Sequence, residues 1–169
     1  ISALGGTSYA GKGGATSVVL PAAQKVAVGG TGLTLAKLLA AKELMDENEV
    51  DEEAPRFFIC ASAQITDLLN TTEIKSADYN SVKALVEGKV NTFLGLQFIR
   101  TQLLTLSAAT RYCYAYAKGA VGFGILSDIQ TSIDRRVDKN MAWQTWGKMD
   151  MGATRIEEAQ VVEIACSET

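Results

Sequence analysis

The 169-residue sequence contains no histidine. This absence excludes catalysis by serine–histidine and cysteine–histidine pairs, zinc sites that use imidazole, and the most common general base of enzymes. Any catalysis would have to depend on carboxylates, lysine or cysteine. No motif assembles these groups into an active site, so we predict no catalytic, cofactor-binding or metal-binding residues and no cofactor.

Cysteine is scarce and widely spaced. Cys60, Cys113 and Cys166 are separated by about fifty residues each, and no two of them form a Cys-x-x-Cys pair. A local zinc motif or a thioredoxin-type motif is therefore excluded. Because the number is odd and the chain is not small, we predict three buried, reduced thiols.

Long apolar runs are also missing. No segment approaches the length of a transmembrane helix, and no charged stretch followed by an apolar one marks a signal peptide. Lys and Arg number 16 against 19 Asp and Glu, which argues against a basic nucleic-acid-binding protein. With 47% hydrophobic and 21% charged residues, the chain has a globular composition, and its length suffices for one sizeable core, with or without a small second lobe.

Glycine is concentrated at the start of the chain, where residues 1–32 hold eight of the fifteen. These residues lie in two clusters, and between them residues 17–20 form a short strand candidate that Pro21 stops. We therefore predict loops joined by one short strand over this part of the chain.

The clearest helix is predicted over residues 33–48. Its apolar residues recur at three- and four-residue steps: Leu35, Leu38, Leu39 and Met45. Thr31 or Thr34 can cap its start, and Lys37 and Lys42 are expected to lie off the apolar stripe. The acidic run at 46–53 opposes the helix dipole, so it marks the helix end and an exposed loop.

The rest of the chain mixes short helices and strands without regular alternation, which is typical of the α+β class. Residues 111–117 alternate strictly, with three tyrosines on one face and Cys113, Ala115 and Ala117 on the other. The other candidates are a buried strand at 56–60, a helix at 62–69, a second helix from Asp78 to Gly88, a strand at 90–101 with a bulge at Gly95, and strands at 129–137, 141–149 and 161–166.

Two glycine motifs invite a nucleotide-binding interpretation. Gly6–Gly13 nearly matches a phosphate-binding loop, but Gly13 stands where a magnesium-binding hydroxyl is needed, so a flexible loop is favoured and no nucleotide hydrolysis is expected. Residues 29–32 precede the predicted helix without the spacing of a dinucleotide fold, and a capped helix entry is favoured. A small nucleotide-binding enzyme that uses Gly6–Gly13 is kept as an alternative.

Other polar groups favour ordinary surface roles. The acidic run lacks the ligand spacing of an EF-hand, so a solvated loop is favoured over a calcium site. Glu157-Glu158 and Asp134/Asp138 could form a carboxylate pair, but no pattern brings them to a cleft. The sequon at 70–72 matters only in a secreted chain, and the tyrosines of 111–117 fit a half-buried strand face.

The order of segments from about residue 17 to the end resembles the major capsid protein of tailed bacteriophages, which has the Hong Kong 97-like fold. No single motif is specific, and the ordered series carries the resemblance: Leu44-Met45-Asp46, Val50-Asp51-Glu52, Arg56–Cys60, Gln64, Asp67-Leu68-Leu69, Ser76–Asn80, Leu85–Val90, Phe93–Ile99, Tyr116–Gly122 and Gly152–Glu158.

The resemblance implies an α+β capsid fold with two lobes. Residues 1–60 would belong to a peripheral lobe with a spine helix at 33–48 and long strands. Residues 61–127 would form an axial lobe, a sheet with flanking short helices, and residues 128–169 would return to the peripheral lobe as strands. The family's N-terminal arm and extended loop are not recognised in this sequence, so the resemblance is to the C-terminal part of such a protein.

The resemblance also implies a function. The chain would be a structural subunit of an icosahedral phage head, not an enzyme, and would assemble with identical copies into hexamers and pentamers around double-stranded DNA. Scaffolding, portal or decoration proteins are further candidate partners, packaged DNA would lie near it without specific binding, and no membrane is expected. Assembly would take place in the cytoplasm of the bacterial host, and the protein would reside in the virion. A non-viral encapsulating shell protein is the other alternative, and residues 1–169 alone are not expected to build a stable shell.

Overall fold

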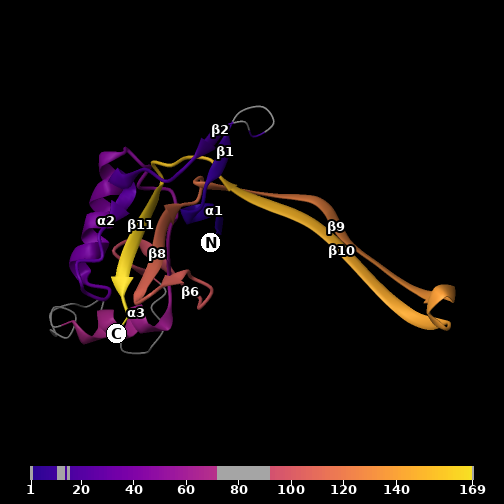
Figure 1. The fold of residues 1–169 in the computed structure, drawn as a ribbon. Helices are drawn as coiled ribbons and strands as arrows, with labels where there is room; N and C mark the ends of the chain where they lie inside the picture. Colours follow the sequence, from indigo (N-terminus) through magenta and orange to yellow (C-terminus); the bar gives the residue numbers. More distant parts are fainter. Residues whose placement is uncertain (1, 11–13, 15, 72–91, 169) are drawn as a thin grey trace.

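The computed structural model describes residues 2–10, 14, 16–71 and 92–168. It consists of a body, in which helices pack on a sheet, and a long two-stranded ribbon that projects from the body (Figure 1). The mixture of helices and strands confirms the predicted α+β class.

The body is built on a seven-stranded mixed sheet. In spatial order its main path runs β3 (Lys25–Val26), β11 (Val161–Ser167), β8 (Thr110–Ala117), β4 (Arg56–Cys60), β6 (Leu96–Arg100) and β5 (Thr92–Phe93), and β7 (Leu106–Ser107) pairs with β8. β8 lies antiparallel between β11 and β4, while β4 and β6 are parallel. At residue 161 the chain thus returns to this sheet and enters it between β3 and β8.

The alternation predicted in β8 is confirmed. Cys113, Ala115 and Ala117 are at most 1% exposed, while Tyr112 and Tyr116 are half-buried on the other face. The three cysteines are free, fully buried thiols of the sheet strands. Burial raises the pKa of Cys60 to about 12, so this thiol stays protonated and unreactive at neutral pH.

The predicted helix is α2 (Leu35–Glu47), and Thr34 is the cap, since its hydroxyl accepts from the Lys37 amide at 3.4 Å. Leu38 and Met45 are fully buried as expected, but Leu39 is 47% exposed. Lys37 was expected off the apolar stripe and is instead buried. The physical reason is that its ammonium lies 2.7–3.0 Å from four carbonyl oxygens, those of Val28, Thr31, Gly32 and Ala165. Burial of the ammonium lowers the pKa of Lys37.

The strand predicted at 90–101 is wrong in one respect. β5 and β6 are two antiparallel strands joined at Leu94-Gly95, whose φ angles are 53° and 79°. Gly95 therefore supplies a left-handed turn between strands rather than a bulge within one. Helix α3 (Ser62–Asn70) matches its prediction, whereas the predicted helix at 78–88 and residue 72 of the sequon lie outside the described residues.

The ribbon consists of β9 (Val121–Arg136) and β10 (Ala142–Arg155), paired antiparallel. A short 3-10 turn, η2 (Val137–Lys139), closes its tip, where Asn140 and Met141 have φ angles of 55° and 60°. The strands predicted at 129–137 and 141–149 are both present and much longer. At about 3.4 Å per residue, the ribbon is roughly 50 Å long.

The predicted ranges 1–60, 61–127 and 128–169 each contribute strands to the sheets of the molecule. The body sheet takes β3 and β4 from the first, β5 to β8 from the second and β11 from the third, and the ribbon crosses residue 127. The reason is strand pairing, which joins segments that are distant in the sequence. Which parts form the peripheral and axial lobes stays a prediction.

Candidate functional site

Most of the exposed large apolar side chains of the described residues lie in the ribbon. Leu126 is 90% exposed, and the exposed fractions of the following side chains lie between 45% and 76%: Phe123, Ile125, Ile129, Ile133, Val137, Met141, Trp143, Trp146 and Met151. A two-stranded ribbon alone in water is at best marginally stable. Exposed apolar surface on this scale marks a contact with another macromolecule, so we take the ribbon as the candidate interaction site.

The outer half of the ribbon has two different faces. The register places Arg135 opposite Trp143 and Ile133 opposite Thr145 on one face, here called the Trp143 face. The next pairs along the strands point the other way and form the Gln144 face: Asp134 with Gln144, Ser132 with Trp146, and Gln130 with Lys148. One face is therefore largely apolar, and the other carries mainly polar side chains around Trp146.

Trp143 and Arg135 make a direct contact on their face. The Arg135 guanidinium carbon lies 4.7 Å from the centre of the Trp143 ring, a cation–π pair across the two strands. Trp and Arg are the residue types most enriched among the energetic centres of protein interfaces. The Trp143 face thus presents such a pair in preformed geometry.

Near its root, the ribbon has one residue pair without side chains. Gly124 pairs with Gly152. A Cβ atom added at Gly124 or Gly152 would meet nothing within 4 Å, and an open hollow of about 630 Å³ lies here among apolar neighbours that include Phe123 and Leu126. A partner can approach the main chain closely at this place.

Arg155 anchors the root of the ribbon to the start of the chain. Its buried guanidinium donates to the carbonyl oxygens of Leu4 (2.7 Å), Gly6 (3.0 Å) and Val18 (3.1 Å). The Ser8 hydroxyl in turn donates to the Arg155 carbonyl at 3.0 Å. These bonds hold α1 (Ser2–Gly5), β1 (Ser8–Ala10) and β2 (Thr16–Val18) against the last residue pair of the ribbon.

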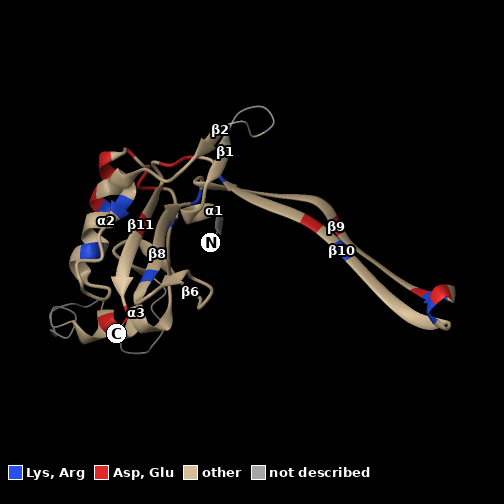
Figure 2. Cartoon of the chain, viewed as in Figure 1, with Lys and Arg blue, Asp and Glu red and all other residues tan. Residues whose placement is uncertain are grey.

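Charge is distributed unevenly over the body (Figure 2). The seven acidic residues of 43–53 are all exposed at the end of α2 and in the following loop, and this stretch contains no Lys or Arg. Asp46 pairs with the buried Arg56 at 2.7 Å. Among the described residues no group of three or more acidic or cysteine side chains is arranged to hold a metal ion, and this surface is an exposed acidic patch.

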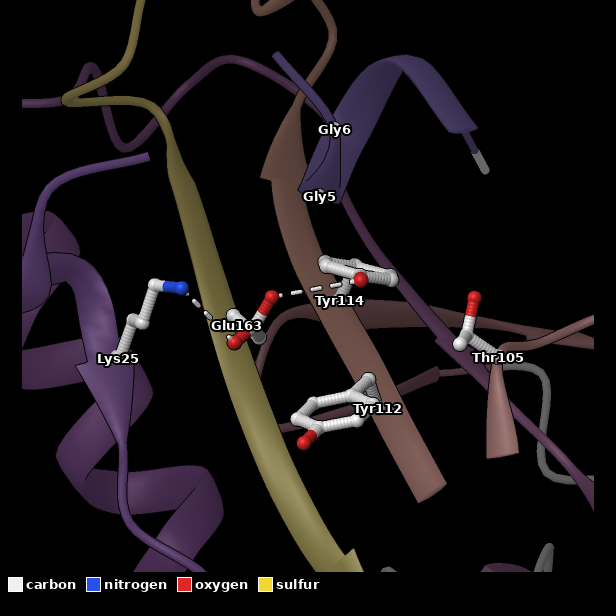
Figure 3. A pocket seen from close by; sticks show the side chains of 7 residues that line it. All are labelled: Gly5, Gly6, Lys25, Thr105, Tyr112, Tyr114 and Glu163. Atoms are coloured by element: carbon white, nitrogen blue, oxygen red, sulfur yellow. Dashed lines mark hydrogen bonds and ion pairs between the residues drawn. The ribbon is translucent and has the colours of Figure 1, made fainter. Parts of the chain in front are cut away.

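A polar hollow of about 340 Å³ lies between the start of the chain and the sheet (Figure 3). Glu163 pairs with Lys25 at 3.4 Å and accepts a hydrogen bond from Tyr114 at 3.4 Å. Burial and the neighbouring Glu163 carboxylate raise the pKa of Tyr114. Gly5 is required here, because a Cβ at this position would lie 2.0 Å from the Tyr114 hydroxyl oxygen. The polar groups of Lys25, Tyr114 and Glu163 bond to one another, and they lie where the start of the chain meets the sheet.

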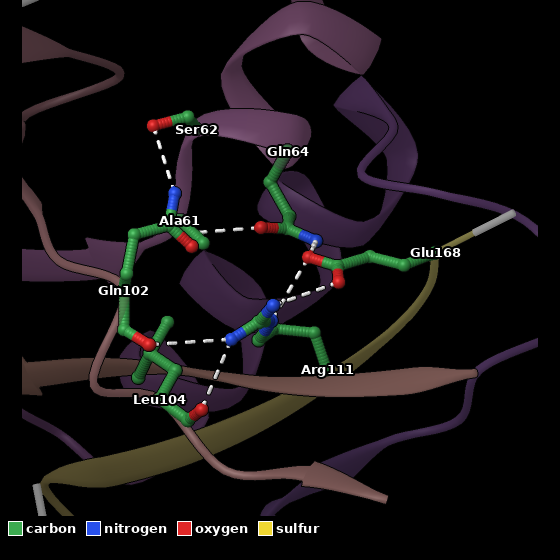
Figure 4. A network of polar contacts seen from close by, with 7 residues as sticks. All are labelled: Ala61, Ser62, Gln64, Gln102, Leu104, Arg111 and Glu168. Carbon is green, nitrogen blue, oxygen red and sulfur yellow. Dashed lines mark hydrogen bonds and ion pairs between the residues drawn. The ribbon is translucent and has the colours of Figure 1, made fainter. Parts of the chain in front are cut away.

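A second polar network ties the end of the chain to α3 and β8 (Figure 4). Arg111 donates twice to Glu168, at 2.9 and 2.8 Å, and once to the Leu104 carbonyl at 3.1 Å. Gln64 donates to Glu168 at 2.9 Å and accepts from the Ala61 amide at 3.2 Å. The Arg111 hydrogen bonds lower the pKa of Glu168. Every member has a partner, which is typical of structural bracing.

The candidates taken from the sequence are not brought into one site. Asp134 and Asp138 lie towards the ribbon tip and Glu157-Glu158 just beyond its root, so these carboxylates occupy opposite ends. Residues 11–13 of Gly6–Gly13 lie outside the described residues. The loop nevertheless connects β1 to β2, an antiparallel pair, and does not lead from a strand into a helix as a phosphate loop must.

None of the helices in the described parts of the chain has the length and apolar character needed to span a bilayer.

Sequence reasoning missed the two features that matter most, the Arg135–Trp143 pair and the anchor at Arg155. The alternation of 129–135 and the glycines at 122, 124 and 152 were the available signals for a ribbon exposed on both faces.

Comparison with known proteins points to one family. A family model described as phage capsid protein matches residues 1–168. Among solved structures, one from Mycobacterium phage Che8 has a TM-score of 0.63 at 14% identity, covering 79% of this chain and 53% of that one. The capsid of cyanophage P-SCSP1u gives 0.61 at 20% identity, covering 79% and 46%.

The shell fold is shared beyond phages. The SrpI encapsulin complex of Synechococcus elongatus gives a TM-score of 0.56 at 10% identity, covering 86% of this chain and 53% of that one. A search of curated proteins gives no match. At these identities the structures show the fold alone, and the chain spans about half the length of each. The fold is the Hong Kong 97-like capsid fold expected from the sequence, and the chain belongs to the phage capsid protein family.

Proposed function

We propose that this chain is the shell-forming part of a major capsid protein, which assembles with identical copies into hexamers and pentamers of an icosahedral head around double-stranded DNA. The observation that carries the proposal is the ribbon. Its apolar side chains are exposed, although the body below it has a closed core. A lattice of identical subunits would bury such a surface in every copy.

The shape of the subunit supports the same function. A ribbon of roughly 50 Å reaches well beyond the body, so it can contact neighbours that the body does not touch. Arg155 fixes the root of the ribbon, which gives each copy the same direction of reach. In this proposal the ribbon supplies the long strands of the peripheral lobe, to which the spine helix α2 also belongs.

The charge pattern supports a non-specific relation to DNA. The net charge is −3, and the acidic residues at 43–53 would repel phosphates. We propose that packaged DNA is enclosed rather than bound, that scaffolding, portal and decoration proteins are the further partners, and that the subunit assembles in the cytoplasm of the bacterial host and resides in the virion. No catalytic step is assigned to it.

A non-viral encapsulating shell is the second candidate, because an encapsulin complex is among the similar structures. The two candidates differ in their contents. Nuclease-resistant double-stranded DNA inside native particles supports the phage head, whereas particles that hold protein cargo and no DNA support the second candidate.

The test is assembly of the full protein that contains this chain. We expect closed icosahedral particles by electron microscopy and light scattering. Leu126→Asp, at a ribbon residue that is 90% exposed, should stop assembly, while Leu103→Asp, at a body residue that is 83% exposed, is the matched control. A wild-type protein that stays monomeric at high concentration and under all tested conditions would contradict the proposal.

A further inference from the structure

We infer that the Trp143 face of one subunit's ribbon binds the exposed side of α2 in a second copy of this chain, so that Arg135 and Trp143 lie against the acidic residues around Leu39. The inference rests on the proposed function, because it names a contact within the shell. It specifies the partner surface, which the presence of the ribbon alone does not.

The two faces of the ribbon differ in polarity, and the difference favours the Trp143 face as the contact surface. The Gln144 face presents Asp134, Gln130 and Lys148, which water can solvate. On the Trp143 face, Ile133 is 66% and Trp143 67% exposed, and their burial would be favourable. A contact in the assembled shell should therefore cover the Trp143 face and leave most of the Gln144 face in solvent.

The chemistry of the Trp143 face calls for an acidic partner with an apolar part. Arg135 stacks on Trp143, and a guanidinium stacked on an aromatic ring can still donate hydrogen bonds to a carboxylate. A purely apolar partner would desolvate this charge without pairing it, at a large cost. A basic partner would repel it.

The exposed side of α2 meets both requirements. Leu39, Glu43 and Glu47 follow one another at four-residue steps, so they lie along one face of the helix, and Leu39 is 47% exposed. A hollow of about 450 Å³ opens among these residues, Lys42 and Asp46. This surface is apolar at its Leu39 end and predominantly acidic over the rest, the complement of the Trp143 face.

The contact must join two copies. Figure 1 shows the ribbon extending away from the side of the body that carries α2, so a subunit cannot bring its own ribbon tip to its own α2. A contact of tip to helix is heterologous, and repeated contacts of this kind close into rings or extend into lattices.

The area favours a lattice over an isolated dimer. Seven residue pairs of about 3.4 Å, on a ribbon about 10 Å wide, offer on the order of 250 Å² for one face. A stable pairwise interface needs about 800 Å² per partner. The contact should therefore be weak alone and effective only when many copies add their contacts together.

The test is a charge exchange in the full protein, with assembly measured by light scattering and electron microscopy. Arg135→Glu, and separately Glu43→Lys combined with Glu47→Lys, should each lower the assembled fraction by about tenfold or more. All three substitutions together should restore most of it. Gln144→Glu, which adds a negative charge on the opposite face, is the matched control and should assemble like the wild type.

Two results would overturn the inference while the shell function stands: wild-type shells that form equally well with Arg135→Glu, or variants that each fail and are not restored by the combination. Thermal unfolding of each variant monomer should match that of the wild type, since all the changed side chains are exposed. Failure of the wild type itself to form shells would contradict the proposed function instead.

Discussion

In the body, Phe58 and Leu68 are fully buried, whereas in the ribbon Leu126 is 90% and Phe123 63% exposed. Both regions are rich in strands and apolar residues, but only the body buries a core of apolar side chains within one chain. Sheet pairing alone therefore does not decide where apolar side chains lie. The body takes its stability from its own core, whereas in the proposed shell neighbouring copies would cover the apolar side chains of the ribbon.

The largest expected effect is a loss of stability in the body. Leu38→Asp places a carboxylate at a fully buried position of α2, and the lost packing together with an unpaired buried charge should cost about 4 kcal/mol or more in the free energy of unfolding. Leu39→Asp on the same helix is the control, since Leu39 is 47% exposed. Chemical denaturation followed by circular dichroism compares the two, and equal stability of both variants would contradict the burial described for α2.

The next effect concerns the junction of the two regions. Arg155→Met removes donors from three carbonyl oxygens and should destabilise the subunit by about 2–3 kcal/mol. Hydrogen exchange should rise first in residues 2–10, which these bonds hold. Arg155→Lys keeps the charge and should recover part of the loss, whereas protection unchanged in Arg155→Met would show that the anchor is dispensable.

A smaller effect should appear at low pH. The Arg111 hydrogen bonds give Glu168 a lower pKa in the folded state than in the unfolded state. Its contribution to stability is therefore complete above the ordinary pKa of 4.5 and is lost as the pH falls through the folded value. Unfolding between pH 6 and 3 should show a shallower loss of stability in Glu168→Gln than in the wild type, and parallel curves would contradict this assignment.

The smallest effect on the isolated subunit is expected in the ribbon. Leu126→Asp should change the unfolding free energy of the monomer by less than about 0.5 kcal/mol, because the side chain has no core to leave. The same substitution should abolish shell formation. A large loss of monomer stability would mean that Leu126 packs within its own chain, and the contrast between the two regions would fail there.

The sequence by itself determined the local elements of the body. The spacing of Leu38 and Met45 predicted α2, the alternation of 111–117 predicted β8, and the run at 56–60 predicted β4, since helix and strand periods are local properties. The ordered series of segments also carried the family resemblance.

Only the tertiary structure decided how these elements combine. The pairing of β11 with β8 joins segments about fifty residues apart in the sequence, because strands find partners across the whole chain. Lys37 became buried because carbonyl oxygens from two distant segments surround its ammonium. The ribbon shows the same limit: alternation at 129–135 indicated a strand, but its exposure on both faces depends on which described segments pack against it, which no local pattern records.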